Sequence, residues 1–203
     1  LTFNPFQENT YIIYDETKAC VLIDPGCCDA AERRELERSV EELGLQPVRL
    51  LNTHCHIDHV LGNAFAARRY QLPLEIHERE IPVLDSLMQT AFYFGVSVEE
   101  PSPAPGRFIE VDEVITFGQT RLEVLFTPGH SPGSISFYCR EDRFIIAGDV
   151  LFQGSIGRTD LFNGTVEVLG SRDDCFFVGN SDAIALYTQS FQQIQRELQL
   201  LLG

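Results

Sequence analysis

Three histidines and an aspartate stand close together in this sequence, at His54, His56, Asp58 and His59. They directly follow an apolar run, Val48–Leu51, that is typical of a buried β-strand. Alternate residues of an extended segment point to the same side, so His54 and His56 can converge on one ion. Asp58 and His59 follow in the turn and can face a second ion. Because imidazole and carboxylate are the usual ligands of zinc and non-haem iron, the run predicts a metal site at a strand end.

Two later segments fit the same site. His130 lies between glycines in the segment Thr127–Gly133, and Asp149 comes just after the apolar run Phe144–Ala147. Either residue alone is more typical of an ordinary turn. Loops at strand ends, however, are where catalytic groups are commonly displayed. Because both follow the histidine run in this order, we expect them to join it as ligands.

The order of the expected elements favours sheets packed together with helices outside, a four-layer α/β arrangement in one domain of 203 residues. Asp29 is expected to cap the first helix. The expected strands are Tyr11–Tyr14, Ala19–Ile23, Val48–Leu51, Leu74–Ile76, Val114–Phe117, Arg121–Phe126, Ser134–Cys139 and Arg143–Ala147. The expected helices are Ala30–Leu43, Gly62–Tyr70, Arg79–Phe94 and Ser190–Leu202, and Pro101–Gly106 is expected to be a loop.

Charge and cysteine content restrict the partners and the compartment. The net charge of −15 argues against binding to nucleic acid or to an anionic membrane surface, and no apolar run is long enough for a transmembrane helix. The six cysteines have irregular spacing, which indicates reduced thiols and a cytoplasmic protein rather than a disulfide framework. The first residues show no signal-peptide pattern and no initiator Met, so we expect one or two residues to precede them.

The ordered motifs resemble those of the metallo-β-lactamase superfamily. These motifs are the H-x-H-x-D-H run from His54, the later P-G-H at His130, the G-D at Asp149, and Asp24 after an apolar strand. Within the superfamily, Gly154–Asp160 resembles the short, single-domain glyoxalase II-like branch, which is also called hydroxyacylglutathione hydrolase-like. The resemblance implies an αββα four-layer sandwich of two mixed sheets with outer helices.

The resemblance also implies roles for individual residues. His54, His56 and His130 would hold one metal, Asp58 and His59 a second, and Asp149 would bridge the two. Asp24 would brace the metal loop by hydrogen bonds. The expected cofactor is zinc, as one or two ions, with iron or manganese as alternatives. A metal-bound hydroxide, oriented by Asp58, would attack a small-molecule thioester or ester. Arg158 is a weaker candidate for contact with a substrate carboxylate.

The C-terminal part, residues 165–203, departs from the family pattern. Family members end with a further ligand histidine, and none follows Asp149 here. Either Thr165–Gln189 is an insertion and the chain is truncated after the Ser190–Leu202 helix, or Asp174–Asn180 is a divergent form of the missing strand. In the second case Asn180, a poor zinc ligand, stands near the ligand position. Both alternatives predict a weaker second metal or a mononuclear protein, with reduced hydrolase activity.

Two other functions compete with the hydrolase. His54, His130 and Asp149 supply the two histidines and one carboxylate of a mononuclear iron persulfide dioxygenase. The atypical C-terminal part instead fits a degenerate, non-catalytic family member that binds metal.

Three further side chains and groups carry expectations of their own. We expect Cys55 to point away from the histidines into the core, and His77 to be a surface or supporting residue. The aromatic residues Phe92–Phe94 are expected in the core or in a pocket wall.

Overall fold

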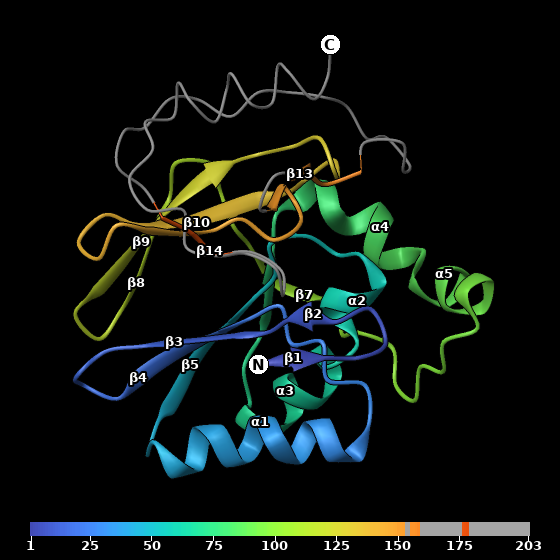
Figure 1. The fold of residues 1–203 in the computed structure, drawn as a ribbon, viewed down its shortest axis with the longest axis horizontal. Coiled ribbons are helices and arrows are strands. Elements are labelled where there is room, and N and C mark those ends of the chain that lie inside the picture. Colours follow the sequence, from blue (N-terminus) through green and yellow to red (C-terminus); the bar gives the residue numbers. More distant parts are fainter. Residues whose placement is uncertain (153–154, 159–175, 179–203) are drawn as a thin grey trace.

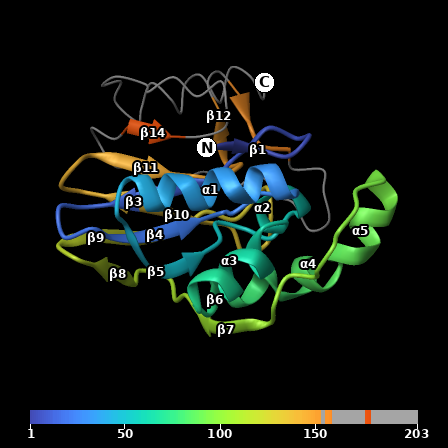
Figure 2. The same cartoon turned by 90° about the horizontal axis from the view of Figure 1, so that it is seen from below.

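Two five-stranded sheets face each other, and helices cover the outer side of the first (Figures 1 and 2). This arrangement comes from a computed structural model, which describes residues 1–152, 155–158 and 176–178. Figure 2 shows α1, Ala30–Glu42, as an outer layer alongside the strands of the first sheet. The expected helix Ser190–Leu202 lies outside the described residues.

The first sheet has the strand order β3-β4-β5-β6-β7. An antiparallel hairpin forms its first two strands, and the next three strands all run parallel to β4, so the sheet is mixed. The parallel strands are joined through helices, as parallel connections require. The strands are β3 Tyr11–Tyr14, β4 Ala19–Ile23, β5 Gln46–Leu51, β6 Leu74–Ile76 and β7 Pro105–Phe108.

The second sheet has the strand order β14-β11-β10-β9-β8 and is mixed as well. Its four consecutive strands are antiparallel, whereas β14 pairs parallel with β11. The strands are β8 Val114–Phe117, β9 Thr120–Phe126, β10 Ile135–Cys139, β11 Phe144–Ile146 and β14 Phe176–Val178.

The short elements lie mostly in the connections between the strands. Two-residue ribbons pair β1 Thr2–Phe3 with β2 Glu8–Asn9, and β12 Leu151–Phe152 with β13 Ser155–Ile156. The remaining helices are α2 Ile57–Val60, α3 Asn63–Tyr70, the 3-10 turn η1 Glu78–Glu80, α4 Ile81–Asp85 and α5 Leu87–Phe94. No helix among residues 1–152 combines the length and the apolar character that crossing a membrane requires.

Strand β4 shows how the sequence divides the core into two layers. Its side chains alternate, so Cys20 and Leu22 belong to the cluster that packs under the helices, while Val21 and Ile23 belong to the cluster between the sheets. A strand buried on both faces has to be apolar throughout, as this one is. The largest fully buried side chains between the sheets are Ile23, Leu51, Ile109, Ile115, Leu122 and Phe137.

Helix α1 begins and packs as its sequence predicts. The side chain of Asp29 accepts hydrogen bonds from the backbone N–H groups of Ala31 and Glu32, and so caps the first turn. Leu36 and Val40, four residues apart, are the buried residues of the helix. The expected cap and apolar face are both present.

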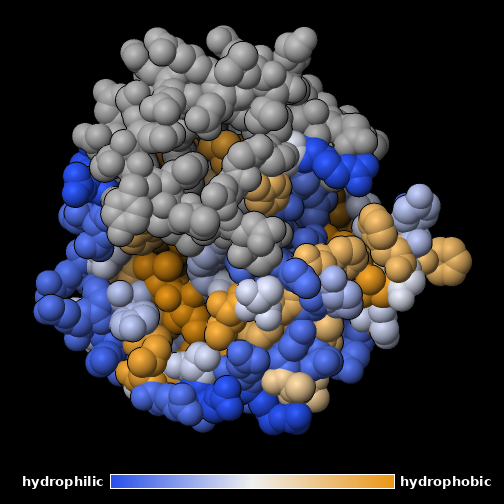
Figure 3. Space-filling model, in the orientation of Figure 1, coloured by the Kyte–Doolittle hydropathy of each residue, from blue (hydrophilic) through white to orange (hydrophobic). Residues whose placement is uncertain are grey.

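The expected helix Arg79–Phe94 is instead broken into η1, α4 and α5. Ser86 separates the last two, and its hydroxyl donates to the carbonyl oxygen of Val83. Helix α5 projects from the body of the molecule (Figures 1 and 2), and Figure 3 shows hydrophobic side chains on this projection. Phe92 and Tyr93 are 87% and 82% exposed, so of the two places expected for them, core or pocket wall, the core is wrong.

The proline-rich composition of Pro101–Gly106 favours a loop, but its last two residues belong to strand β7. The segment Pro105–Phe108 nevertheless pairs with β6 as the edge strand of the first sheet, a position that tolerates proline.

Strand β14 falls within the atypical part of the chain. Phe176–Val178 lies in the segment Asp174–Asn180 and pairs parallel with β11. Asn180 itself lies outside the described residues.

Candidate metal centre

The six expected metal ligands come from four loops and turns that the fold brings together. His54 and His56 lie in the loop after β5, and Asp58 and His59 lie in α2. His130 lies between β9 and β10, and Asp149 follows β11. Ligand atoms within 4.8 Å of one another define one group of His54, His56 and His130 and a second of His54, His59 and Asp149. Both sheets therefore contribute to one centre.

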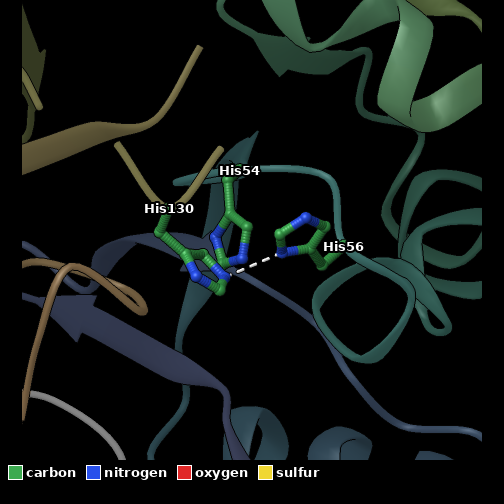
Figure 4. A group of neighbouring side chains, drawn as sticks. All are labelled: His54, His56 and His130. Atoms are coloured by element: carbon green, nitrogen blue, oxygen red, sulfur yellow. Dashed lines mark hydrogen bonds between the residues drawn. The ribbon is translucent and has the colours of Figure 1, made fainter. Parts of the chain in front are cut away.

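The first group consists of three imidazoles that face each other (Figure 4). Nδ1 of His56 lies 2.8 Å from Nε2 of His130. Nδ1 of His130 lies 2.8 Å from the carbonyl oxygen of Arg158, which can only accept a hydrogen bond. His130 therefore carries its proton on Nδ1, and in its neutral form Nε2 presents a lone pair to the centre. This backbone contact is what Arg158 contributes here, besides any role of its side chain.

His54 is oriented by a relay of hydrogen bonds. Its Nδ1 lies 3.1 Å from Oγ1 of Thr53, and that hydroxyl donates to Oδ2 of Asp24 at 2.6 Å. Because the hydroxyl has already used its proton, it accepts one from Nδ1 of His54. The Nε2 lone pair of His54 is buried and meets no hydrogen-bonding partner in the described part of the chain. A buried imidazole lone pair without a hydrogen-bond donor fits the role of a metal ligand.

His59 lies among carboxylates at the centre of the second group. Its Nε2 is 3.3 Å from Oδ1 of Asp149 and 3.6 Å from Oδ2 of Asp58. Its Nδ1 is 3.1 Å from Oδ2 of Asp24 and 3.9 Å from Oε1 of Glu8. Burial alone would lower the pKa of His59, but three surrounding carboxylates, of which Asp58 has the largest effect, raise it well above its usual value.

The first group, by contrast, is held neutral. Burial lowers the pKa of His54 well below its usual value, and the neighbouring imidazoles lower it further. Burial, followed by His130, lowers the pKa of His56 to about 3. Burial also lowers the pKa of His130, although Asp149 opposes this effect. Neutral imidazoles are the protonation state that metal ligands need, so the donor set fits a divalent cation.

The two acidic residues at the centre differ in their protonation behaviour. Burial raises the pKa of Asp58, and His59 offsets this only in part. Burial would also raise the pKa of Asp149, but His59 and the other imidazoles lower it below its usual value. Asp149 is therefore ready to act as an anionic ligand, and Asp58 is the better proton acceptor of the two.

Three other residues that the sequence singled out lie around the centre. Asp24 accepts from the backbone N–H and the hydroxyl of Thr53, which agrees with the bracing role expected of it. Cys55 is buried and packs in the cluster under the helices, as expected. His77 is buried rather than on the surface, and its ring stacks on Phe126.

Three contacts at the centre carry no local signal in the sequence. Thr53 links Asp24 to His54, Glu8 lies beside His59, and Glu80 bonds the two loops that carry the first group. The contacts of Glu8 and Glu80 join residues that are distant along the chain. The contact of Thr53 depends on a hydroxyl that no motif marks.

Gly148 shows how tightly the centre is packed. Its backbone has a φ of +51°, and a Cβ added there would lie 2.3 Å from Oγ1 of Thr53. A side chain at this position would displace the relay to His54, which explains the glycine before Asp149.

A family profile described as Metallo-beta-lactamase superfamily matches residues 3–195. The chain belongs to the metallo-β-lactamase superfamily. The two mixed sheets described above are accordingly those of the metallo-β-lactamase fold. The sequence motifs and the described fold agree on this assignment.

Relatives in this superfamily include two bacterial proteins of similar length. The chain is 36% identical over 165 residues to the probable metallo-hydrolase YqgX of Bacillus subtilis, covering 81% of this chain and 76% of that protein. It is also 36% identical over 167 residues to the hydroxyacylglutathione hydrolase GloC of Haemophilus influenzae, with the same coverage.

Solved structures of the metallo-β-lactamase fold superpose well on the chain. TTHA1623 in a di-iron-bound form has a TM-score of 0.72 and 36% identity, covering 81% of this chain and 78% of that one. The B3 metallo-β-lactamase BLEG-1 has a TM-score of 0.77 and 27% identity, covering 100% and 98%.

Proposed function

We propose that this member of the metallo-hydrolase superfamily is a metal-dependent hydrolase that cleaves small-molecule thioesters of the hydroxyacylglutathione type. The observation that carries the proposal is the buried lone pair on Nε2 of His54, which meets no donor among the described residues and lies near the other ligand candidates. Three neutral imidazoles around this point form a site for one divalent cation.

In this proposal the two groups share a carboxylate. His54, His56 and His130 would hold the first ion, and Asp58 and His59 would hold the second. Asp149 would be shared between the two groups, since Oδ1 lies 3.3 Å from Nε2 of His59 and Oδ2 lies 3.7 Å from Nε2 of His130. Zinc fits this mixture of nitrogen and oxygen donors, and iron, as in the di-iron form of TTHA1623, or manganese is the alternative.

In the proposed hydrolysis, a metal ion and the side chains of the protein have different roles. A bound ion supplies Lewis acidity, which lowers the pKa of water to about 7 and polarises a carbonyl. The carboxylate of Asp58, which lies 3.6 Å from Nε2 of His59 at the centre, would orient the attacking water and accept its proton. Addition to the thioester carbonyl followed by loss of the thiolate yields a carboxylic acid and a thiol.

The substrate class is supported by similarity and by charge. GloC of Haemophilus influenzae, named a hydroxyacylglutathione hydrolase, is 36% identical over most of the chain. A net charge of −15 disfavours a nucleic-acid or anionic-membrane partner, so we propose a small-molecule substrate. The five cysteines in the described residues are free, which supports a location in the reducing cytoplasm.

Thiol release from a panel of thioesters and esters tests the proposal, with protein loaded with zinc or with iron under anaerobic conditions. We expect wild-type turnover of a hydroxyacylglutathione and a loss of at least about 100-fold in kcat for Asp58→Asn. His54→Ala should abolish turnover. His77→Ala, which removes a buried histidine outside both groups, is the matched control.

Each remaining outcome identifies another function. Oxygen consumption with a persulfide by the iron-loaded protein, without thioester cleavage, would identify the dioxygenase. Absence of turnover with every substrate would identify a non-catalytic metal-binding member. Normal thioester cleavage by His54→Ala would show that the chemistry takes place elsewhere.

A further inference from the structure

Glu80 is a buried carboxylate that lies between the two loops carrying the three histidines of the first group. It ends the 3-10 turn η1 and is 1% exposed. Its Oε2 accepts from the backbone N–H of Cys55 at 2.7 Å. Its Oε1 accepts from the hydroxyl of Ser131 at 2.7 Å and from the backbone N–H of Gly133 at 2.6 Å. One carboxylate thus joins two segments that are far apart in the sequence.

The positions of these three donors give the contacts their significance. Cys55 stands between His54 and His56, and Ser131 directly follows His130. The hydrogen bond from the backbone N–H of Cys55 holds in place the backbone that carries His54 and His56. The hydrogen bonds from Ser131 and Gly133 hold in place the loop that carries His130. The 2.8 Å separation between Nδ1 of His56 and Nε2 of His130 therefore depends on how Glu80 joins the two loops.

Gly133 is shaped to receive this side chain. A Cβ added there would lie 2.9 Å from the backbone nitrogen and from Cγ of Glu80, so no larger residue permits the approach. The same loop holds its turn through a hydrogen bond from the N–H of Ser134 to the carbonyl of Ser131. The close packing leaves Glu80 little freedom to move.

The contacts also require a carboxylate. All three neighbours are donors, so an acceptor-only group satisfies each of them. An amide in its place would direct N–H groups at one or two donors and leave buried donors unpaired, which costs about 1–3 kcal/mol per group. None of the ion pairs in the described residues involves Glu80, so its role is not that of a salt bridge.

We propose that Glu80 is a positioning residue that sets the spacing between the His54–His56 pair and His130, and so determines the metal affinity of the three-histidine group. The inference rests on the proposed function only in taking this group as a metal site. Outer residues that hold metal ligands in place contribute roughly 10–100-fold to metal affinity.

Glu75 provides a matched control. It is also a buried glutamate, with a side chain 3% exposed, and it lies five residues earlier in the chain. Its carboxylate pairs with the guanidinium groups of Arg49 and Arg107 and contacts neither histidine loop. Loss of its charge should therefore lower stability and leave the spacing of the imidazoles unchanged.

The test compares Glu80→Gln, Ser131→Ala and Glu75→Gln in the full chain. Zinc and cobalt affinities are measured on metal-free protein by competition with a chelator, and the free energy of unfolding is measured in urea. We expect Glu80→Gln to weaken the tighter site by roughly 10–100-fold. Ser131→Ala, which removes one of three donors, should weaken it less. Glu75→Gln should keep wild-type affinity even where it lowers stability.

A second readout is independent of metal. In metal-free protein the ¹⁵N imidazole shifts report the contact between His56 and His130, and Glu80→Gln should change them while Glu75→Gln does not. Wild-type affinity and unchanged shifts in Glu80→Gln would overturn the proposal. If Glu80→Gln fails to fold, Ser131→Ala decides in the same way. If wild-type protein binds neither metal, the proposed function fails, and the imidazole shifts still test the positioning.

Discussion

The side chain of Asp24 orients two imidazoles of the centre, those of His54 and His59. It follows β4 with a left-handed φ of +51°, which turns its carboxylate back toward the loop after β5. Oδ2 accepts from the hydroxyl of Thr53 and lies 3.1 Å from Nδ1 of His59. Through Thr53 it also determines the tautomer of His54. Both imidazoles thereby direct Nε2 toward the centre, which is the geometry that a metal ion requires.

Thr53→Val tests this relay at the level of one hydroxyl group. Valine has the same shape but can neither donate to Asp24 nor accept from Nδ1 of His54, so His54 loses the contact that orients it. We expect metal affinity to fall by roughly 10–100-fold in chelator competition. Thr53→Ser keeps the hydroxyl and should keep most of the affinity. Equal affinities in the two variants would show that the hydroxyl has no part in ligand orientation.

Residues of the centre could be predicted from the sequence where their role depends on neighbours in the chain, and could not where it depends on distant contacts. The run from His54 to His59 was recognisable because its spacing on a strand and turn is itself the signal. Glu8 and Glu80 were not recognisable, because their roles depend on contacts with residues 51 positions away in each case. Their surroundings are produced by the fold, and a glutamate in a polar segment is otherwise typical of the surface.

At the scale of elements, the turn between β3 and β4 connects the two sheets. The carboxylate of Asp15 accepts from the backbone N–H and the hydroxyl of Thr17 within its own hairpin. It also accepts from the backbone N–H groups of Gln119 and Thr120, in the hairpin of β8 and β9. Gly118 in that hairpin has a φ of +52°, and a Cβ there would lie 2.4 Å from Asp15.

Asp15 should make stability depend on pH in the acid range. Hydrogen bonds, first of all from Thr17, lower its pKa from the ordinary 3.8 to about 2. Because the folded-state pKa is the lower one, the stabilisation is complete above pH 4 and is lost as the pH falls through 2. Metal-free Asp15→Asn should therefore unfold at lower urea than wild type at pH 6, with the difference shrinking toward pH 2. Glu16→Gln, which removes the neighbouring charge, is the control, and a pH-independent difference would contradict this account.

The sheets and the first helices could be predicted from sequence, because the spacing of apolar residues and the helix caps are local properties of the chain. Ala19–Ile23 and Val114–Phe117 lie where the patterns indicated. The helix expected over Arg79–Phe94 was too long, because apolar spacing alone does not register the break at Ser86. Strand β7 was missed because its pairing with β6 outweighs an unfavourable local composition.

At the scale of the whole molecule, the metal-free centre encloses more acidic side chains than basic ones, and burial raises the pKa of Glu8 and of Asp58. Glu8, Asp24, Asp58 and Asp149 surround His59, the one basic group whose pKa is raised among the histidines of the centre. The chain as a whole has a net charge of −15. Enclosed carboxylates that lack a counterion oppose folding, so an ion that binds only the folded chain removes part of this cost.

Metal binding should accordingly raise thermal stability through the same residues that are proposed to hold it. At a free zinc concentration of 100 times Kd, the gain is about 2.7 kcal/mol. For a chain of this size such a gain corresponds to a rise in Tm of roughly 5–11 °C. Differential scanning calorimetry of metal-free protein, with and without zinc, measures it. The double variant His54→Ala/His130→Ala should lose most of the rise. Magnesium at equal concentration controls for screening of the net charge, since hard oxygen-seeking ions bind imidazole poorly. A rise of equal size with magnesium, or in the double variant, would place the stabilisation in the general charge of the molecule instead of the histidine centre.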